Sequence, residues 1–245
     1  MSVKVIAEIG SNWEGDVELA KNHIQNAKES GASHVKFQMW RAHDLYTTDH
    51  PNLETIKKSE LTKDVAKELK KFSDKIGINW FCSVFNPDSV DFLETLNVSL
   101  YKIASRTATL NDKFSIETIQ KVADTKKMTF VSTGEGGDKE KISKFFNHNN
   151  IRFTYCVSKY PTQDIDIDWN EILNYEFFSD HSLGITIPLV YAIRKKILGN
   201  KDIFIEKHTR FENSKGPDAS FAITYDELSN LTRHLKRIEN LEFGK

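Results

Sequence analysis

The chain has only two cysteines among its 245 residues and almost no net charge. Cys82 and Cys156 do not form a Cys-X-X-Cys motif, and both fall in predicted strands, which indicates buried small side chains rather than a disulfide or a redox pair. A formal net charge of -1 gives no electrostatic basis for binding nucleic acid or an anionic membrane. A bound anion would therefore have to be held by a local site.

Long apolar runs are also missing. The N-terminal residues lead directly into a strand-like segment without the apolar core of a signal peptide, and no later run approaches the roughly 20 residues that span a bilayer. Internal repeats, low-complexity tracts and linkers are absent as well, so a second folded domain is not expected. These features predict a cytoplasmic protein that binds neither membranes nor nucleic acid.

What the sequence does contain is an alternation of short apolar runs, rich in β-branched and aromatic residues, with longer segments of helical period. This alternation is typical of a parallel sheet wrapped by helices, and closed βα barrels commonly have about 250 residues. We therefore expect an α/β fold, a single-domain (β/α)8 TIM barrel over residues 1–245. The strands are predicted at residues 3–9, 34–39, 78–84, 100–104, 128–132, 151–157, 177–180 and 203–206.

Capping signals place several of the intervening helices. Apolar residues at helical spacing run up to Gly31 and again to Gly77, and Asn86 before a proline is a predicted N-cap. Thr224 and Glu227 have the spacing of a capping box for the last helix. The stretch 40–61, which contains His43, His50 and Pro51, is predicted to be a mobile loop over the barrel mouth.

Polar residues gather at the ends of the predicted strands, which is where barrel enzymes have their active sites. Lys36 and Lys102, with several hydroxyl groups and a glycine turn, suit a phosphate, although a strand lysine can equally be an interior residue paired with a carboxylate. His181 and His208 end adjacent strands and suit a divalent metal. Two ligands are fewer than the three usual for catalytic zinc. Either a carboxylate completes the set, or a harder ion carries water and a substrate oxygen.

Several of these segments together resemble one enzyme family. They are Ala7-Glu8-Ile9-Gly10-Ser11-Asn12, Val35-Lys36-Phe37-Gln38, Tyr101-Lys102-Ile103-Ala104-Ser105, Ser132-Thr133-Gly134, Tyr160-Pro161-Thr162, Ser179-Asp180-His181-Ser182-Leu183-Gly184, Glu206-Lys207-His208 and Gly216-Pro217-Asp218. In this order they resemble the sialic acid synthases, which condense phosphoenolpyruvate with an N-acetylated hexosamine on a (β/α)8 barrel.

The resemblance implies a role for each matching position. His181 and His208 would bind a divalent ion, typically manganese, with magnesium and cobalt as alternatives, and Glu8 would steady a cationic intermediate or handle the proton of water. Asp218 would lie near the acceptor sugar, and Glu206 would contact the metal ligands without binding the metal itself. Phosphoenolpyruvate would lie among Lys36, Gln38, Ser83, Lys102, Ser105, Ser132, Ser158, Tyr160 and Ser179. The implied products are a nonulosonic or related 3-deoxy-2-keto sugar acid and phosphate.

Departures from the family pattern concern the acceptor side. Trp13 stands where the family has histidine, Arg106 and Thr107 replace a glycine and an acid, and Ser83-Val84 replaces Thr-Pro. The C-terminal antifreeze-like domain of the family is not found in these 245 residues, so a separate protein supplying it is one expected partner. The other expected partners are phosphoenolpyruvate, an aldose acceptor and a second copy of the chain in a homodimer.

Two other functions remain open from the residues alone. A Schiff-base aldolase could use Lys36 or Lys102, because a lysine inside an apolar barrel has the lowered pKa that such chemistry requires. The imidazole pair counts against this reading. A catalytically silent barrel that binds a sugar or a partner subunit is the third hypothesis, which the altered acceptor positions would favour. The other histidines, among them His23, His34, His148 and His234, are given no role.

Overall fold

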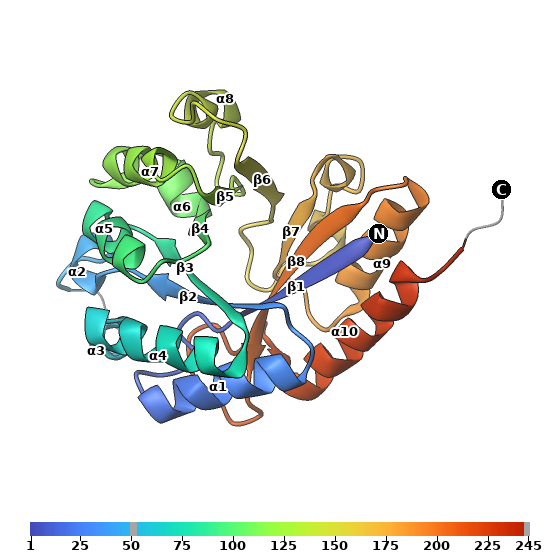
Figure 1. Cartoon of the computed structure of the whole chain (residues 1–245), viewed down its shortest axis with the longest axis horizontal. Coiled ribbons are helices and arrows are strands. Elements are labelled where there is room, and N and C mark those ends of the chain that lie inside the picture. The colour runs from blue at the N-terminus through green and yellow to red at the C-terminus, as the bar shows by residue number, and fades with distance from the viewer. Residues whose placement is uncertain (50–52, 243–245) are drawn as a thin grey trace.

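The computed structural model describes residues 1–49 and 53–242, and within them eight parallel strands close into a barrel (Figure 1). Strand β1 pairs with both β2 and β8, and every other strand pairs with its sequence neighbours, which confirms the predicted (β/α)8 fold. The strands are β1 (Ser2–Glu8), β2 (His34–Met39), β3 (Asn79–Val84), β4 (Leu100–Ile103), β5 (Met128–Ser132), β6 (Ile151–Tyr155), β7 (Phe177–Asp180) and β8 (Asp202–Arg210).

Helices cover the outside of this barrel. The longer ones are α1 (Val17–Glu29), α4 (Lys63–Ile76), α5 (Pro87–Thr95), α7 (Ser115–Asp124), α9 (Thr186–Ile197) and α10 (Tyr225–Glu239). Shorter elements are α2 (Ala42–Leu45), α3 (Leu53–Lys58), α6 (Ser105–Ala108), α8 (Lys139–Ser143), η1 (Asp164–Asp166), η2 (Ile172–Asn174) and the two-residue strand β9 (Ile223–Thr224). None of the described helices combines the length and the apolar character needed to cross a bilayer.

Local signals account for the helix ends. The Asn86 side chain accepts a hydrogen bond from the Ser89 N–H, Gly77 ends α4 with a φ of +74°, and the capping box of Thr224 and Glu227 is present. The stretch 40–61, predicted to be a mobile loop over the barrel mouth, contains two short helices, α2 and α3, which the prediction missed. His50 and Pro51 fall outside the described residues.

Two predicted strand ends also need correction. Strand β6 ends at Tyr155, so Cys156 follows the strand rather than lying in it. Strand β8 continues to Arg210, which places His208 inside the strand. Cys82 and Cys156 are both buried and free.

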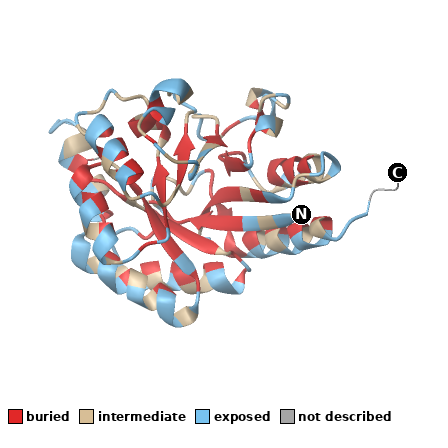
Figure 2. Ribbon diagram, turned by 45° about the horizontal axis from the view of Figure 1, so that its top comes forward, coloured by how far each residue is buried: buried red, intermediate tan, exposed pale blue. Residues whose placement is uncertain are grey.

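The barrel interior is filled by layers from alternate strands. Ile6, Phe81, Phe130 and Phe177, from β1, β3, β5 and β7, belong to one buried apolar cluster. Because strand side chains alternate between the two faces, residues two positions further along point into the same interior. Figure 2 shows the strands almost wholly buried and the helices buried only on their inward faces. The aromatic layer therefore forms a dry floor beneath the carboxyl ends of the strands.

The next layers toward those ends are polar. Lys36, Lys102, Thr154 and Glu206 come from the even-numbered strands, and each is buried. Above them, the odd-numbered strands contribute Glu8, Ser83, Ser132 and Ser179, all at most 4% exposed. On the four odd-numbered strands the inward side chains thus change from apolar to polar within two residues, and this change marks where packing stops and a site begins.

Strands β7 and β8 are joined on their outward face by a buried ion pair. Lys207 Nζ lies 2.7 Å from Asp180 Oδ2, both side chains are fully buried, and the two residues are register partners. The Ser182 N–H and hydroxyl also donate to the Asp180 carboxylate at 3.0 Å. Each member of the pair immediately precedes a histidine, so this contact fixes the register of the strands that carry His181 and His208.

Removing one member of this ion pair should lower the free energy of unfolding. Lys207→Met leaves the Asp180 carboxylate buried without its counter-charge, and we expect a loss of about 3–5 kcal/mol in the free energy of unfolding. The double variant Lys207→Met, Asp180→Asn should recover most of that loss. Urea denaturation measures both, with Lys70→Met in the exposed Lys70–Asp74 pair as a control expected to cost less than about 1 kcal/mol. Equal losses in the single and double variants would contradict this account.

Candidate active site

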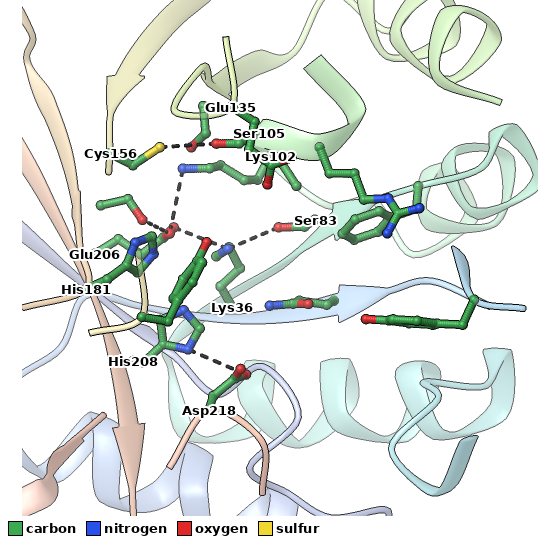
Figure 3. A pocket seen from close by; sticks show the side chains of 18 residues that line it. Lys36, Ser83, Lys102, Ser105, Glu135, Cys156, His181, Glu206, His208 and Asp218 are labelled. Atoms are coloured by element: carbon green, nitrogen blue, oxygen red, sulfur yellow. Dashed lines mark hydrogen bonds and ion pairs between the residues drawn. The ribbon is translucent and has the colours of Figure 1, made fainter. Parts of the chain in front are cut away.

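A cavity of about 260 Å³ lies at the carboxyl ends of the strands (Figure 3). It is lined by Lys36, Gln38, Tyr46, Ser83, Phe85, Lys102, Ala104, Ser105, Arg106, Ser132, Glu135, Cys156, Tyr160, Ser179, His181, Glu206, His208 and Asp218. Most residues predicted to bind substrate or metal are therefore brought together. Glu8 and Ser158 are the exceptions, since neither lines the cavity.

Glu206 lies at the centre of the charged layer. Its Oε2 is 3.4 Å from Lys36 Nζ, its Oε1 is 3.7 Å from Lys102 Nζ, and the Ser179 hydroxyl donates to Oε1 at 2.7 Å. Burial opposes ionisation of this carboxyl, but the two ammonium groups outweigh it and lower the pKa of Glu206 to about 2. The prediction that Glu206 only supports the metal ligands from behind is incomplete, because this carboxylate pairs with both lysines.

The pKa of the Glu8 carboxyl group is shifted in the opposite direction. Its Oε1 accepts a hydrogen bond of 2.7 Å from Gln38, and its Oε2 lies 3.1 Å from Lys36 Nζ. Complete burial raises the pKa of Glu8 to about 7, since the charge of Lys36 offsets desolvation only in part and the neighbouring Glu206 adds repulsion. Two carboxyl groups in one site thus differ widely in proton affinity, the pattern by which acid–base groups and permanently ionised groups are distinguished.

The two lysines differ in their partners. Lys36 Nζ donates to Ser83 Oγ at 3.0 Å and pairs with two carboxylates, whose charges raise its pKa although burial works against them. Among the described residues, Lys102 Nζ has no hydrogen-bond acceptor, and burial lowers the pKa of Lys102. This cation is only 2% exposed and lines the cavity. A buried ammonium group without an acceptor is suited to an anionic ligand.

The two predicted metal ligands lie side by side on one wall of the cavity. The His181 and His208 ring centroids are 5.5 Å apart, and burial lowers the pKa of both imidazoles, which favours the neutral form that binds metals. His181 Nδ1–H donates to the Val157 carbonyl at 2.9 Å, leaving Nε2 as the coordinating atom. Within residues 1–49 and 53–242, no group of three or more His, Cys, Asp or Glu side chains has the arrangement of a metal site. A divalent ion held by the two imidazoles stays a prediction.

Asp218 joins this side of the cavity through a loop that approaches β1 closely. Its Oδ2 accepts from the Ser11 hydroxyl at 3.1 Å and lies 3.6 Å from His208 Nδ1. Burial raises the pKa of Asp218. Gly10 has a φ of +55°, and a Cβ there would lie 2.4 Å from Asp218 Oδ2. The glycine is thus required both by its backbone conformation and by the carboxylate beside it.

Hydroxyl and thiol groups line the opposite side. Ser105 Oγ lies 3.2 Å from Cys156 Sγ and accepts from the Gly134 N–H at 3.2 Å. A Cβ on Gly134 would approach the Ser158 Oγ to 2.9 Å, so Ser158 lies close to the turn that follows β5. Ser158 does not line the cavity, and its predicted role in substrate binding stays a prediction.

Sequence reasoning assigned no role to several lining residues. Cys156 and Glu135 directly follow Tyr155 and the Ser132-Thr133-Gly134 turn, so the strand-end rule could have included them. Tyr46 comes from the segment after β2, and only tertiary packing brings it to the cavity. Tyr160, which was predicted, packs its ring 4.5 Å from that of His181.

Comparisons with known proteins found a matching family model and several similar proteins. The model of the NeuB family matches residues 23–244. A curated, uncharacterized protein of Methanocaldococcus jannaschii is 31% identical over 97% of the chain and 71% of its own length. N,N'-diacetyllegionaminic acid synthase of Legionella pneumophila is 28% identical over 98% of the chain and 73% of its own length. The crystal structure of the N-acetylneuraminic acid synthetase from Leptospira borgpetersenii superposes with a TM-score of 0.87 at 28% identity, covering 100% of this chain and 87% of that one.

The position of Asp218 can be tested through Gly10. Gly10→Ala should displace the Asp218 carboxylate and break its contact with Ser11, because the new methyl group occupies the same space. Gly77→Ala is the matched control, since Gly77 also has a positive φ but no atom within 4 Å of an added Cβ. Both variants should lose about 1–3 kcal/mol in urea denaturation from backbone strain. Crystal structures should show Asp218 moved only in Gly10→Ala, and an unmoved carboxylate would refute this role for Gly10.

Proposed function

The chain belongs to the NeuB family, and we propose that it condenses phosphoenolpyruvate with an N-acylated aldose to give a nonulosonic or related 3-deoxy-2-keto sugar acid and phosphate. One observation carries this proposal above the others. A single cavity holds the buried Lys102 ammonium group, which lacks an acceptor among the described residues, and two neutral imidazoles. An anion site beside a pair of metal-binding nitrogens suits a reaction between an anionic enol ester and an aldehyde.

Phosphoenolpyruvate would bind at the lysine side. Lys36 and Lys102 would supply positive charge to its phosphate and carboxylate, and Ser83, Ser105 and Ser132 would donate hydroxyl hydrogen bonds. Glu206 limits the net charge of this half, because its ionised carboxylate already pairs with both lysines. The aromatic floor keeps water out beneath the ligand and strengthens these contacts.

The reaction forms one carbon–carbon bond and breaks one carbon–oxygen bond. C3 of phosphoenolpyruvate attacks the aldehyde carbon of the acceptor, whose oxygen becomes a hydroxyl group, and C2 becomes an electron-poor centre. Water adds to C2 and gives up a proton, and the C2–O bond to phosphate then breaks as the keto group forms. His181 and His208 would hold the divalent ion, most simply Mn²⁺, that supplies Lewis-acid polarisation of the aldehyde.

Glu8 is the proposed acid–base group for this reaction; it does not line the cavity itself but contacts Lys36 and Gln38, which do. Its pKa of about 7 lies near the operating pH, where a carboxyl group both accepts and returns a proton efficiently. Gln38 and Lys36 fix its two oxygens beside the lysine pair. Asp218, on the imidazole side, is placed to contact the acceptor.

A Schiff-base aldolase is the second candidate, and one observation favours it. Burial lowers the pKa of Lys102, and its Nζ has no acceptor within the described part of the chain, as a nucleophilic amine would require. The paired imidazoles have no function in that mechanism. Borohydride reduction in the presence of pyruvate, followed by mass spectrometry, should leave Lys102 unmodified. A trapped adduct that forms equally well with a chelator present would favour the aldolase.

The condensation itself is tested by phosphate release. Purified protein with phosphoenolpyruvate and Mn²⁺ should release phosphate in the presence of N-acetylmannosamine or another N-acylated aldose, and a chelator should abolish the release. A small antifreeze-like protein is added in a parallel series, and the oligomeric state is measured to test the expected homodimer. No phosphate release with any aldose in either series would support the silent barrel instead.

The role of the imidazole pair is tested by His181→Ala. We expect phosphate release to fall by more than about 100-fold, because Lewis-acid assistance is worth several kcal/mol. Mn²⁺ binding, measured by electron paramagnetic resonance, should weaken in parallel. His234→Ala, on the outer helix α10, serves as the control and should match the unaltered protein. Undiminished metal-dependent activity in His181→Ala would show that the metal assignment is wrong.

A further inference from the structure

His23 is a buried histidine on α1 that the proposed reaction does not use, and it does not line the cavity. Its Nε2 lies 3.1 Å from the carbonyl oxygen of Asn12, which belongs to the turn 10–16 after β1. Its Nδ1 lies 2.6 Å from the hydroxyl oxygen of Tyr225, the first residue of α10. Helices α1 and α10 are neighbours on the outside of the barrel (Figure 1). His23 therefore joins both helices to the turn.

The neutral state of the His23 ring fixes the direction of these two hydrogen bonds. Burial lowers the pKa of His23 to about 4, so at neutral pH the ring carries a single N–H. Because the Asn12 carbonyl can only accept, Nε2–H donates to it, and Nδ1 accepts from the Tyr225 hydroxyl. An apolar side chain of similar size cannot reproduce either bond.

Asn12 is itself packed between β8 and the loop 211–222, which connects β8 to β9 and carries Asp218. Its Nδ2 donates to the carbonyl of Thr209 in β8 at 2.9 Å. A Cβ on Gly216 would lie 2.6 Å from Asn12 Oδ1 and 3.0 Å from Asn12 Cα. The loop backbone thus lies directly against Asn12, at a distance that only glycine allows.

Two further contacts join the loop 211–222 to the turn 10–16. The Ser11 N–H and hydroxyl donate to Asp218 Oδ2 at 3.3 and 3.1 Å. The Lys215 N–H donates to Glu14 Oε1 at 2.7 Å. The position of the Asp218 carboxylate therefore depends on where the turn lies.

Asp218 belongs to the imidazole side of the cavity. Figure 3 shows its carboxylate beside His208, with Oδ2 3.6 Å from Nδ1. The lysine side is held by other contacts, because Lys36 and Lys102 both pair with Glu206 of β8. Among the described residues, no hydrogen bond or ion pair joins the Lys102 or Glu206 side chains to the turn 10–16. A displacement of the turn should therefore reach Asp218 before it reaches the lysine pair.

We propose that His23 is a positioning residue for the acceptor side of the site, because it holds the turn that places the Asp218 carboxylate. The inference rests on the proposed condensation, in which Asp218 contacts the aldose, and it adds a residue outside the cavity on which that contact depends. His23 acts through Asn12 and the loop 211–222 without touching either substrate.

The first test compares hydrogen exchange in His23→Leu and His34→Leu. His34 is the matched control, because it is also buried, its pKa is also lowered to about 4, and it begins β2 at the end of the barrel opposite the cavity. Only His23→Leu should accelerate exchange at the Ser11 and Lys215 amides, by about fivefold or more, since the turn loses a buried hydrogen bond. Equal exchange rates in the two variants would overturn the proposal.

Substrate measurements give the second test. In His23→Leu the KM for the best aldose of the panel should rise about tenfold, because a charge-assisted hydrogen bond to the displaced Asp218 carboxylate weakens. The dissociation constant of phosphoenolpyruvate, measured by calorimetry, should stay within about twofold. An aldose KM like that of His34→Leu, or an equal loss of phosphoenolpyruvate affinity, would overturn the proposal.

Two contingencies leave the test decisive. If no aldose supports turnover, the proposed condensation is refuted, and the exchange rates still decide whether His23 holds the turn. If His23→Leu does not fold, Tyr225→Phe replaces it, since this variant keeps the ring and removes only the hydroxyl that donates to His23 Nδ1. Exchange at the same two amides should then accelerate, and unchanged rates would overturn the proposal.

Discussion

The buried Glu206 carboxylate, held between Lys36 and Lys102, is the interaction on which the rest of this site depends. Two ammonium groups in the interior of a barrel would repel each other and carry a large desolvation penalty without a shared counter-charge. Glu206 supplies that counter-charge from β8, and His208, two residues further along the same strand, points into the same cavity. Strand β8 therefore carries both the counter-charge of the two lysines and one histidine of the imidazole pair.

The surroundings of the Glu206 carboxylate explain why the pKa values of Glu206 and Glu8 differ so strongly. An aromatic floor including Phe130 and Phe177 excludes water from below, so charges act on each other more strongly than they would in solvent. Under those conditions Glu206 stays ionised because it has two cations, while Glu8 shares only Lys36 and keeps a pKa of about 7. The division between a permanent anion and a proton-exchanging group thus follows from how many cations each carboxyl contacts.

The fold and much of the site could be predicted because they depend on local and periodic signals. The alternating apolar runs predicted the barrel. Because active sites of such barrels lie at the carboxyl ends of the strands, they also predicted that Lys36, Lys102, His181 and His208 lie close together, and all four line the cavity. The number of contacts made by Glu206 could not be predicted, since the distances between side chains on different strands depend on barrel stagger.

The same limit applies to residues from the loops. Tyr46 reaches the cavity through tertiary packing of the segment after β2, for which no short pattern exists. The helices in residues 40–61 were missed because they are short and their buried residues pack in a small apolar cluster of their own. Ser158 was predicted to bind substrate because it follows a strand, but it does not line the cavity, so its role stays a prediction.

The central claim is that the cavity binds phosphoenolpyruvate through its buried lysines, and calorimetric titration of this ligand tests it most directly. The account predicts one binding site per chain, with affinity reduced about tenfold or more in Lys102→Met, since a charge-assisted hydrogen bond is lost. Lys195→Met, which removes an equally buried lysine on the outer helix α9, should bind like the unaltered protein. Undiminished binding in Lys102→Met, or an equal loss in both variants, would contradict the account.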